Sequence, residues 1–301
     1  MRGNTRGLME SALASVIFGF SNMFNTLGFK WISPVNFLAM RFTIAFIGLN
    51  LLILTGRLSI SLKGKPVHKL LLLGFIQPVI GFLCDNYGIY YTSASFAGSM
   101  VALAPIVSLM LGVLIMHEHI TPVQAVSAVV AVIGAAILNA DTSGGGRPLK
   151  GVLLVLGSVI TGRTYLMMSK SFSDCFSSTE RTYVQLGIGS AAFCLMAAVR
   201  AASSGVDWKF ADQPEFWISV LYLAILASLV AYLLQNHSIE LISNTQSGIM
   251  AMLVPVISVL SGVFILHEDF SLRQMLGVVL ILVSVYGATH HEELKAEKAG
   301  R

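Results

Sequence analysis

The sequence predicts an all-α integral membrane protein in which ten transmembrane helices form two inverted five-helix repeats. Of its 301 residues, 55% are hydrophobic and only 11% are charged, whereas soluble domains carry about 25% charged residues. The apolar residues form continuous runs of about 20, the length of a membrane-spanning helix. The second half of the chain also repeats the first. Continuous runs exclude a β-barrel, whose strands alternate in hydrophobicity.

Polar breaks divide the chain into ten apolar segments. The first is too long for the apolar core of a signal peptide and lacks a clear cleavage site, so we expect it to remain as a span. Residues 1–140 are predicted to form the first repeat, 150–289 the second, and 290–301 a cytoplasmic tail. The expected spans are 8–29, 33–55, 69–91, 95–116, 121–140, 150–170, 180–199, 215–239, 244–266 and 271–289.

Lysine and arginine predict the orientation of these spans. With a cytoplasmic N-terminus, eleven of them lie on the cytoplasmic side: Arg2, Arg6, Arg57, Lys63, Lys65, Lys69, Lys170, Arg181, Lys295, Lys298 and Arg301. Six lie on the other side: Lys30, Arg147, Lys150, Arg200, Lys209 and Arg273. Because cytoplasmic loops carry the positive excess, we expect a multi-pass protein of the cell (plasma) membrane with both termini cytoplasmic. Its expected partner is the lipid bilayer, not nucleic acid.

The internal repeat has consequences for function. At a shift of 150 residues, positions 82–136 align with 232–286 without a gap, and about 16 of the 55 pairs are identical. At a shift of 140, Arg41 falls on Arg181. Five spans per repeat is an odd number, so the second copy would enter the membrane upside down. Inverted repeats are typical of secondary transporters, although a duplicated scaffold or receptor without transport remains an alternative.

Three stretches carry a family resemblance: 37–42 (Phe-Leu-Ala-Met-Arg-Phe), 104–121 from Ala-Pro to His-Glu-His-Ile-Thr, and 254–271 from Val-Pro to His-Glu-Asp-Phe-Ser. In these the chain resembles the drug/metabolite transporter superfamily, in its bacterial ten-helix EamA-type branch. The resemblance implies a central cavity walled by helices one to four and six to nine, with helices five and ten peripheral. It also implies alternating access and export of an amino acid or related small metabolite.

Other function classes receive little or no support. A facilitator or importer of a nucleotide-like or vitamin-like solute remains open. No GxxxxGK[ST] loop occurs, so ATP is not expected to drive transport directly, and no catalytic constellation lies at membrane depth, so we expect no enzyme. The three cysteines lack CxxC spacing, which predicts neither disulfides nor a metal site, and no cofactor is expected. The sequence specifies no oligomeric state.

Arg163 is the best candidate for substrate binding. It lies past the middle of the sixth span, where a charge is costly to insert, and no acid is near it in sequence. A guanidinium can bind a substrate carboxylate or phosphate through two parallel hydrogen bonds. The alternative is that its stem extends toward the headgroups or that it bonds carbonyl groups of a broken helix.

Arg41 and Asp85 form the second candidate, because adjacent antiparallel spans place them at similar depth. Either they form a buried structural pair, which lowers the cost of both charges, or Asp85 carries a coupling proton. Other polar residues recur on single helix faces, where they either bind substrate or let helices pack closely. The full set predicted to bind substrate is Asn22, Gln77, Asp85, Asn86, Arg163, Tyr165, Gln235 and Asn236.

Pro105 and Pro255 occupy equivalent positions in the repeats, which we expect to be mid-span. Each removes a backbone donor and can kink its helix, as a hinge for alternating access or as a static bend. Glu118 and Glu268 follow His at helix ends, where the dipole of the next helix favours an acid. These pairs are predicted to lie on opposite membrane faces, so they cannot share a metal ion.

Overall fold

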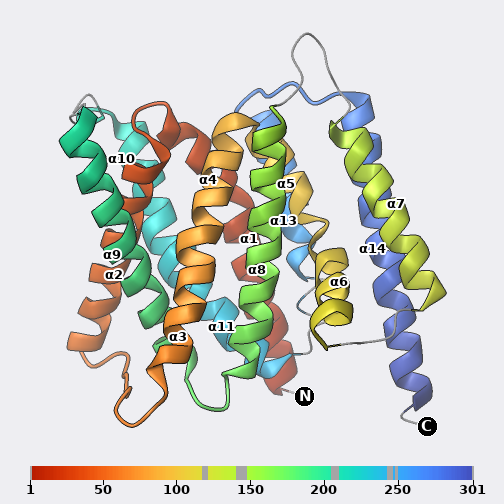
Figure 1. The fold of residues 1–301 in the computed structure, drawn as a ribbon, viewed down its shortest axis with the longest axis horizontal. Helices are drawn as coiled ribbons and strands as arrows, with labels where there is room; N and C mark the ends of the chain where they lie inside the picture. Colours follow the sequence, from red (N-terminus) through yellow and green to blue (C-terminus); the bar gives the residue numbers. More distant parts are fainter. Residues whose placement is uncertain are drawn as a thin grey trace.

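The fold consists of helices, without strands, over the residues that the computed structural model describes: 2–116, 121–139, 148–204, 210–242, 247 and 250–299 (Figure 1). The first part of the chain contains α1 (Arg2–Phe29), α2 (Pro34–Leu54), α3 (Val67–Gly74), η1 (Phe75–Gly81), α4 (Phe82–Tyr91), α5 (Ala94–Val101), α6 (Ala104–Met116) and α7 (Pro122–Asn139). The second part contains α8 (Leu149–Ser171), α9 (Ser178–Ser204), α10 (Pro214–Leu221), η2 (Tyr222–Val230), α11 (Ala231–Leu241), α13 (Leu253–Phe264) and α14 (Leu272–Ala299).

The helices run up and down through one bundle, and both chain ends lie at its lower end in Figure 1. Six helical stretches are long and apolar enough to cross a membrane: Asn4–Phe29, Pro34–Leu54, Val67–Tyr91, Leu149–Ser171, Ser178–Ser203 and Pro214–Leu241. A seventh is formed if the bent pair α5 and α6 counts as one span. The prediction of an all-helical membrane protein is therefore confirmed.

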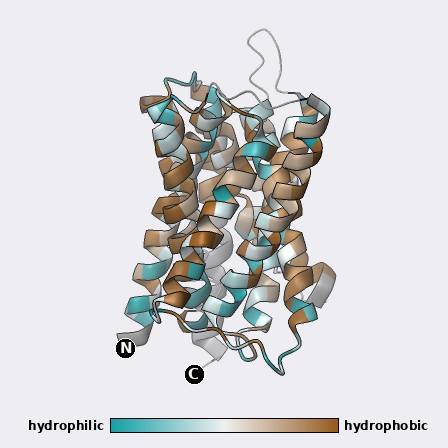
Figure 2. Cartoon of the chain, turned by 90° about the vertical axis from the view of Figure 1, so that its left-hand side faces the viewer, coloured by the Kyte–Doolittle hydropathy of each residue, from teal (hydrophilic) through white to brown (hydrophobic). Residues whose placement is uncertain are grey.

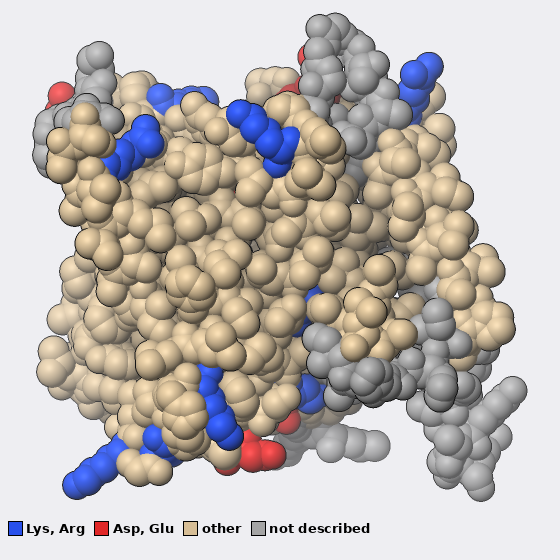
Figure 3. Space-filling view, in the orientation of Figure 1, with Lys and Arg blue, Asp and Glu red and all other residues tan. Residues whose placement is uncertain are grey.

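The surface has the distribution of polarity that a bilayer requires. Figure 2 shows hydrophobic residues over the middle of the bundle and most hydrophilic residues toward its two ends. On the face in Figure 3, most charged side chains also lie at the ends, separated by a broad uncharged band. Large apolar side chains such as Leu54, Leu114 and Phe264 are more than two-thirds exposed, which is favourable against lipid and unfavourable in water.

Local sequence signals explain where several helices begin. Pro34 occupies the first turn of α2, where its missing N–H costs no hydrogen bond. At α9, Ser177 and Glu180 each bond the other's backbone N–H. At α14, Ser271 and Gln274 do the same. These two reciprocal capping boxes each satisfy two amide groups that a helix start would leave unpaired.

Two spans contain wide π-helical turns near their middle. In the third span the turn is η1, and Pro78 inside it lacks a donor and crowds the carbonyl four residues before it, which favours a local widening of the helix. In the eighth predicted span the turn is η2, which contains no proline. Both widened segments lead directly into helices that line the central cavity described below.

Both candidate prolines lie near the middle of their predicted spans, 95–116 and 244–266, and each lies in the first turn of a helix. The fourth predicted span breaks between α5 and α6 and bends there by 43°. Pro105 follows the break as the second residue of α6, and Pro255 is the third residue of α13. Both prolines are tolerated at these positions because the first amides of a helix have no intrahelical acceptor.

α5 is fastened to the second half of the chain at its first turn. The Glu268 carboxylate accepts hydrogen bonds from the Ala94 and Ser95 amides at 2.9 and 2.8 Å. We expected the dipole of the following helix, α14, to favour this acid; it instead caps a helix 174 residues earlier in the chain. Close by, a Cβ added at Gly98 would overlap Ser258 of α13, so glycine permits this close contact between the two helices.

α7 and α14 pack chiefly against each other and lie together at one edge of the bundle (Figure 1). Gly134 of α7 allows this approach, because a Cβ there would meet the Gly277 carbonyl oxygen at 2.8 Å. The resemblance implied that these two helices are peripheral, and the structure places them at the periphery. The remaining helices surround the middle of the bundle, where the candidate site lies.

Candidate functional site

A cavity of about 190 Å³ lies inside the bundle. Its walls come from α1, α2, η1, α4, α8, α11 and α13, with two further residues from α5 and α6. The resemblance also implied a wall from the seventh helix, but among the described residues α9 contributes none. The predicted site residues that line the cavity are Asn22, Arg41, Gln77, Asp85, Arg163, Tyr165 and Gln235. The sequence thus identified side chains from six helical segments, α1, α2, η1, α4, α8 and α11, that meet in one place.

Arg163 reaches the cavity from α8 with little to neutralise it. Its Nε donates one hydrogen bond of 2.7 Å to Ser108 Oγ of α6, and among the described residues no carboxylate pairs with it. The Ser108 hydroxyl lies 3.1 Å from the Ala104 carbonyl, to which it donates. The two terminal guanidinium nitrogens make no hydrogen bond to the described part of the chain, so they are available to an anionic group in the cavity.

Asp85 faces the same cavity from α4. Its only hydrogen bond within the described chain comes from Ser158 of α8, and at 3.4 Å this bond is long. The predicted structural ion pair between Asp85 and Arg41 is absent from the structure, although both residues line the cavity. The ion pair does not form because equal depth on neighbouring helices does not ensure that two side chains turn toward each other.

Arg41 is instead held by neighbours that the sequence did not suggest. Its Nε donates to Ser228 Oγ of η2 at 2.7 Å, and its guanidinium lies 4.8 Å from the centre of the Phe82 ring. The side chain is only 1% exposed. A ring face attracts a cation most strongly where water is excluded, so this contact replaces part of the stabilisation expected from Asp85.

The other predicted residues divide into two groups. Asn22 lines the cavity but also donates to Ser258 Oγ at 2.9 Å, so it joins α1 to α13. Gln77 lines it from η1 and Gln235 from α11. Asn86 and Asn236 are fully buried and do not line it. Their predicted contact with substrate is not supported, because helix rotation turns them away from the cavity and into the packing.

No group of three or more His, Cys, Asp or Glu side chains that could hold a metal ion occurs among the described residues. The predicted His117–Glu118 helix end lies outside that part of the chain. Asn25 and Tyr232 line the cavity but were missed by the sequence analysis. Asn25 could have been found, since it follows Asn22 by three residues and therefore shares its helix face.

Comparison with known proteins agrees with this geometry. The model of the EamA-like transporter family matches residues 5–140 and 149–289. The chain belongs to the EamA-like transporter family. A relative named "Uncharacterized transporter YcxC", from Bacillus subtilis, is 28% identical over 98% of this chain and 96% of its own length. An uncharacterised transporter of Archaeoglobus fulgidus is 24% identical over 85% and 89%.

Further relatives of this EamA-like chain extend the range of organisms. Protein PecM of Dickeya dadantii is 24% identical over 74% of this chain and 80% of its own length. A solved crystal structure superposes with a TM-score of 0.68 at 17% identity, covering 95% of this chain and 96% of that one, which shows a shared fold. The family and the names of the relatives establish a transporter-family membrane protein and not an enzyme.

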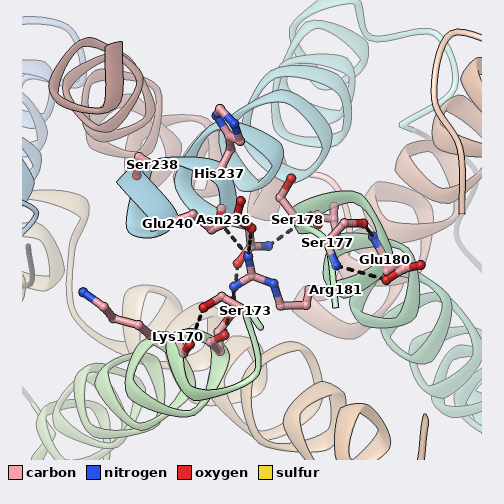
Figure 4. Close-up of polar contacts among 12 residues, drawn as sticks. Lys170, Ser173, Ser177, Ser178, Glu180, Arg181, Asn236, His237, Ser238 and Glu240 are labelled. Atoms are coloured by element: carbon pink, nitrogen blue, oxygen red, sulfur yellow. Dashed lines mark hydrogen bonds and ion pairs between the residues drawn. The ribbon is translucent and has the colours of Figure 1, made fainter. Parts of the chain in front are cut away.

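The EamA-like bundle also contains the buried cation Arg181, which we expected on the cytoplasmic side, at the start of the seventh predicted span. It lies in the first turn of α9 and is 1% exposed. Its terminal nitrogens donate to the Ser169 carbonyl and hydroxyl and to the Asn236 carbonyl, each at 2.9 Å. It also forms an ion pair with Glu240. Figure 4 shows how the Arg181 guanidinium extends from α9 toward its partners on α8 and α11.

Asn236 belongs to this same structural cluster. Its side-chain carbonyl lies 3.0 Å from the Tyr165 hydroxyl and 3.1 Å from the Ser169 hydroxyl, and its amide donates to Thr182 at 3.0 Å. The alignment of Arg41 with Arg181 was the signal that could have identified a buried position. Three helices of the EamA-like fold therefore meet in one polar network near the lower end of the bundle.

Proposed function

We propose that this protein is a secondary transporter that moves a small metabolite across the membrane by alternating access, and that it exports an amino acid or a related metabolite. The observation that carries the proposal is a central cavity lined by the Arg163 guanidinium, which has no carboxylate partner among the described residues, and by the weakly bonded Asp85 carboxylate. Uncompensated charges in a membrane-spanning bundle are costly, and they mark substrate or ion pathways by default. The export direction rests on the family resemblance.

The positions of the two charged groups along α8 suit a zwitterion. Asp85 contacts Ser158 of α8, and Arg163 follows Ser158 by five residues, about 7.5 Å along a helix axis. The ammonium and carboxylate of an α-amino acid are about 3 Å apart, and a hydrogen bond of about 2.8 Å at each end extends this reach to about 8.6 Å. The volume, about 190 Å³, favours such a solute over a nucleotide.

Flux into liposomes tests this proposal. Purified protein is reconstituted and supplied with labelled amino acids, nucleotides and vitamin-like solutes, with protein-free liposomes as the control. We expect saturable, protein-dependent movement of one or a few amino acids and little movement of nucleotides. Selective nucleotide or vitamin movement would overturn the amino-acid assignment. Absence of movement for every solute would favour a non-transporting scaffold or receptor.

We also propose that ten spans form two inverted EamA-like repeats, residues 1–140 and 150–289, with residues 290–301 as a cytoplasmic tail in the plasma membrane. Three observations support this architecture. Three shorter apolar helices, Ala125–Ile137, Leu253–Phe264 and Leu272–Ser284, accompany the longer spans. The shift of 150 residues places η1 on 225–231, which overlaps η2. The family model also matches the chain in two successive stretches.

Cysteine labelling tests the proposed topology. We introduce Cys singly at Ser61 and at Asp212, two exposed positions at opposite ends of the bundle, in a background without native cysteines. With both termini cytoplasmic, a membrane-impermeant maleimide added to intact cells should label Asp212→Cys and not Ser61→Cys, and lysis should expose Ser61→Cys. The reverse pattern would contradict the orientation that the distribution of lysine and arginine predicts.

A further inference from the structure

A second cavity lies at the end of the bundle opposite the chain termini, next to the α1–α2 connection. Its volume is about 620 Å³, and it is separate from the central cavity. Its walls come from the end of α1, the connection to α2, the first turn of α2, the last turns of α4, and α9. Nothing in the proposed transport site uses these residues. Neighbouring residues of α1 line the two cavities: Asn25 lines the first, and Phe29, one turn later, lines the second.

Both charged side chains on the wall of this cavity are cations. Arg200 of α9 has no ion pair within the described chain, and Lys30 forms an exposed pair with Glu215 at 3.2 Å. A third cation, Lys150, sits 3.7 Å from the centre of the Tyr91 ring, which lines the same cavity. Beside this cavity, Glu215 is thus the acid described next to three cations, so the wall of the cavity has a local positive potential that attracts anions.

Hydrogen-bonding groups in the same wall lack partners. Trp31 Nε1, Ser33 Oγ and Asn36 Oδ1 are buried atoms without a hydrogen bond to the described part of the chain, and all three residues line the cavity. A buried polar atom without a partner costs about 1–3 kcal/mol, so three within six residues require an explanation. A bound oxyanion could accept hydrogen bonds from the indole and the hydroxyl. Ser33 also precedes α2 without a side-chain cap, which adds to the positive potential.

The opposite wall is aromatic. Tyr87 and Tyr91 stack with ring centres 6.2 Å apart, and Tyr90 meets Tyr91 edge to face at 5.4 Å. These rings, with the indole of Trp31, provide flat apolar surface beside the cations. Pairs of aromatic rings gain about 0.5–1.5 kcal/mol beyond simple burial. We propose that this cavity is a second binding site, beyond the proposed transport site, for a small aromatic anion whose carboxylate or phosphate contacts Arg200 and Lys30.

Trp31 provides a direct reporter for this proposal. The chain has three tryptophans, so Trp208→Phe and Trp217→Phe leave Trp31 as the only indole. The protein is placed in phosphatidylcholine nanodiscs and titrated with benzoate. We expect a saturable change in Trp31 emission, weakened roughly tenfold or more by Arg200→Gln, because a charge-assisted hydrogen bond is lost. Arg200→Gln leaves the Lys30–Glu215 pair intact, and Arg57→Gln, an exposed cation at the other end, is the matched control that should not change the titration.

Further titrations test whether the aromatic ring, the negative charge and the location of the site are as proposed. Cyclohexanecarboxylate should bind more weakly than benzoate, because it lacks a ring face, and benzyl alcohol should bind more weakly, because it lacks the charge. Arg163→Gln should leave the Trp31 response unchanged, which separates this site from the proposed transport site. The titration is repeated in phosphatidylglycerol nanodiscs. If the parent protein then needs more benzoate than in phosphatidylcholine, and Arg200→Gln does not, the site also accepts a lipid phosphate. Absence of a saturable change, or an equal response in the parent and Arg200→Gln proteins, would refute the site.

Discussion

Replacement of Arg181 by Met should destabilise the protein by about 3–5 kcal/mol, the cost typical of removing one partner of a buried ion pair. The change leaves Glu240 without its cation and leaves the Ser169 and Asn236 carbonyls without the donors that they have in the structure. We expect a lower melting temperature in detergent and less monodisperse protein. Arg57→Met, at an exposed loop position, is the matched control and should behave like the parent.

A double-mutant cycle distinguishes this network from simple loss of packing. Glu240→Met alone leaves the buried Arg181 guanidinium without its anion. Arg181→Met and Glu240→Met should therefore each lower the free energy of unfolding strongly. The combined variant should be less destabilised than the sum of the two, since it removes both charges. If the two losses add, Arg181 and Glu240 do not interact in solution as they do in Figure 4.

Replacement of Arg163 by Gln should have the largest effect on transport. Loss of a hydrogen bond to a charged group costs about 1.5–3 kcal/mol, which corresponds to a loss of affinity of roughly 10- to 150-fold. Stability should change little, because Ser108, the residue that loses its donor, still donates to the Ala104 carbonyl. Arg163→Lys keeps the charge but loses the planar fork, so its affinity should be intermediate.

Two measurements made together decide the role of Arg163. Substrate-dependent thermal stabilisation reports binding, and liposome flux reports transport. Arg273→Gln removes an exposed cation at the start of α14 and should leave both measurements unchanged. If a variant at Arg163 yields less folded protein but keeps the apparent affinity of the parent, the role of this residue is structural.

The positions of the helices were largely predictable, because hydrophobic runs and short polar breaks are properties of the linear sequence. Each predicted span overlaps an observed helix in the described part of the chain. A kink at Pro105 was predicted, and the fourth span bends just before it, but the wide turns η1 and η2 were not predicted. Such irregularities depend on whether neighbouring helices can satisfy the freed backbone groups, and this is decided by tertiary packing.

The candidate site was predictable in composition but not in its contacts. Periodicity places Gln77 and Asp85 on one helix face, and both do line the cavity. It cannot specify how two helices rotate relative to each other, so it did not show that Arg41 and Asp85 form no direct ion pair, and it missed the contacts of Arg41 with Ser228 and Phe82. The burial of Arg181 was not predicted for a related reason: whether a charged residue in the first turn of a helix is buried depends on partners from other helices.

The cap on α5 has a consequence for how the chain is made. Ala94 and Ser95 leave the ribosome first, and Glu268, which satisfies their amides, lies 174 residues later. Synthesis proceeds at about 5–20 residues per second. The amides at the start of α5 are therefore made roughly 9–35 s before the Glu268 carboxylate that caps them. During that interval the nascent first half holds unpaired amides at the end of a helix inside or beside the bilayer. Biogenesis therefore cannot finish the two halves one after the other, and the first half completes only when α13 and the residues after it have been inserted.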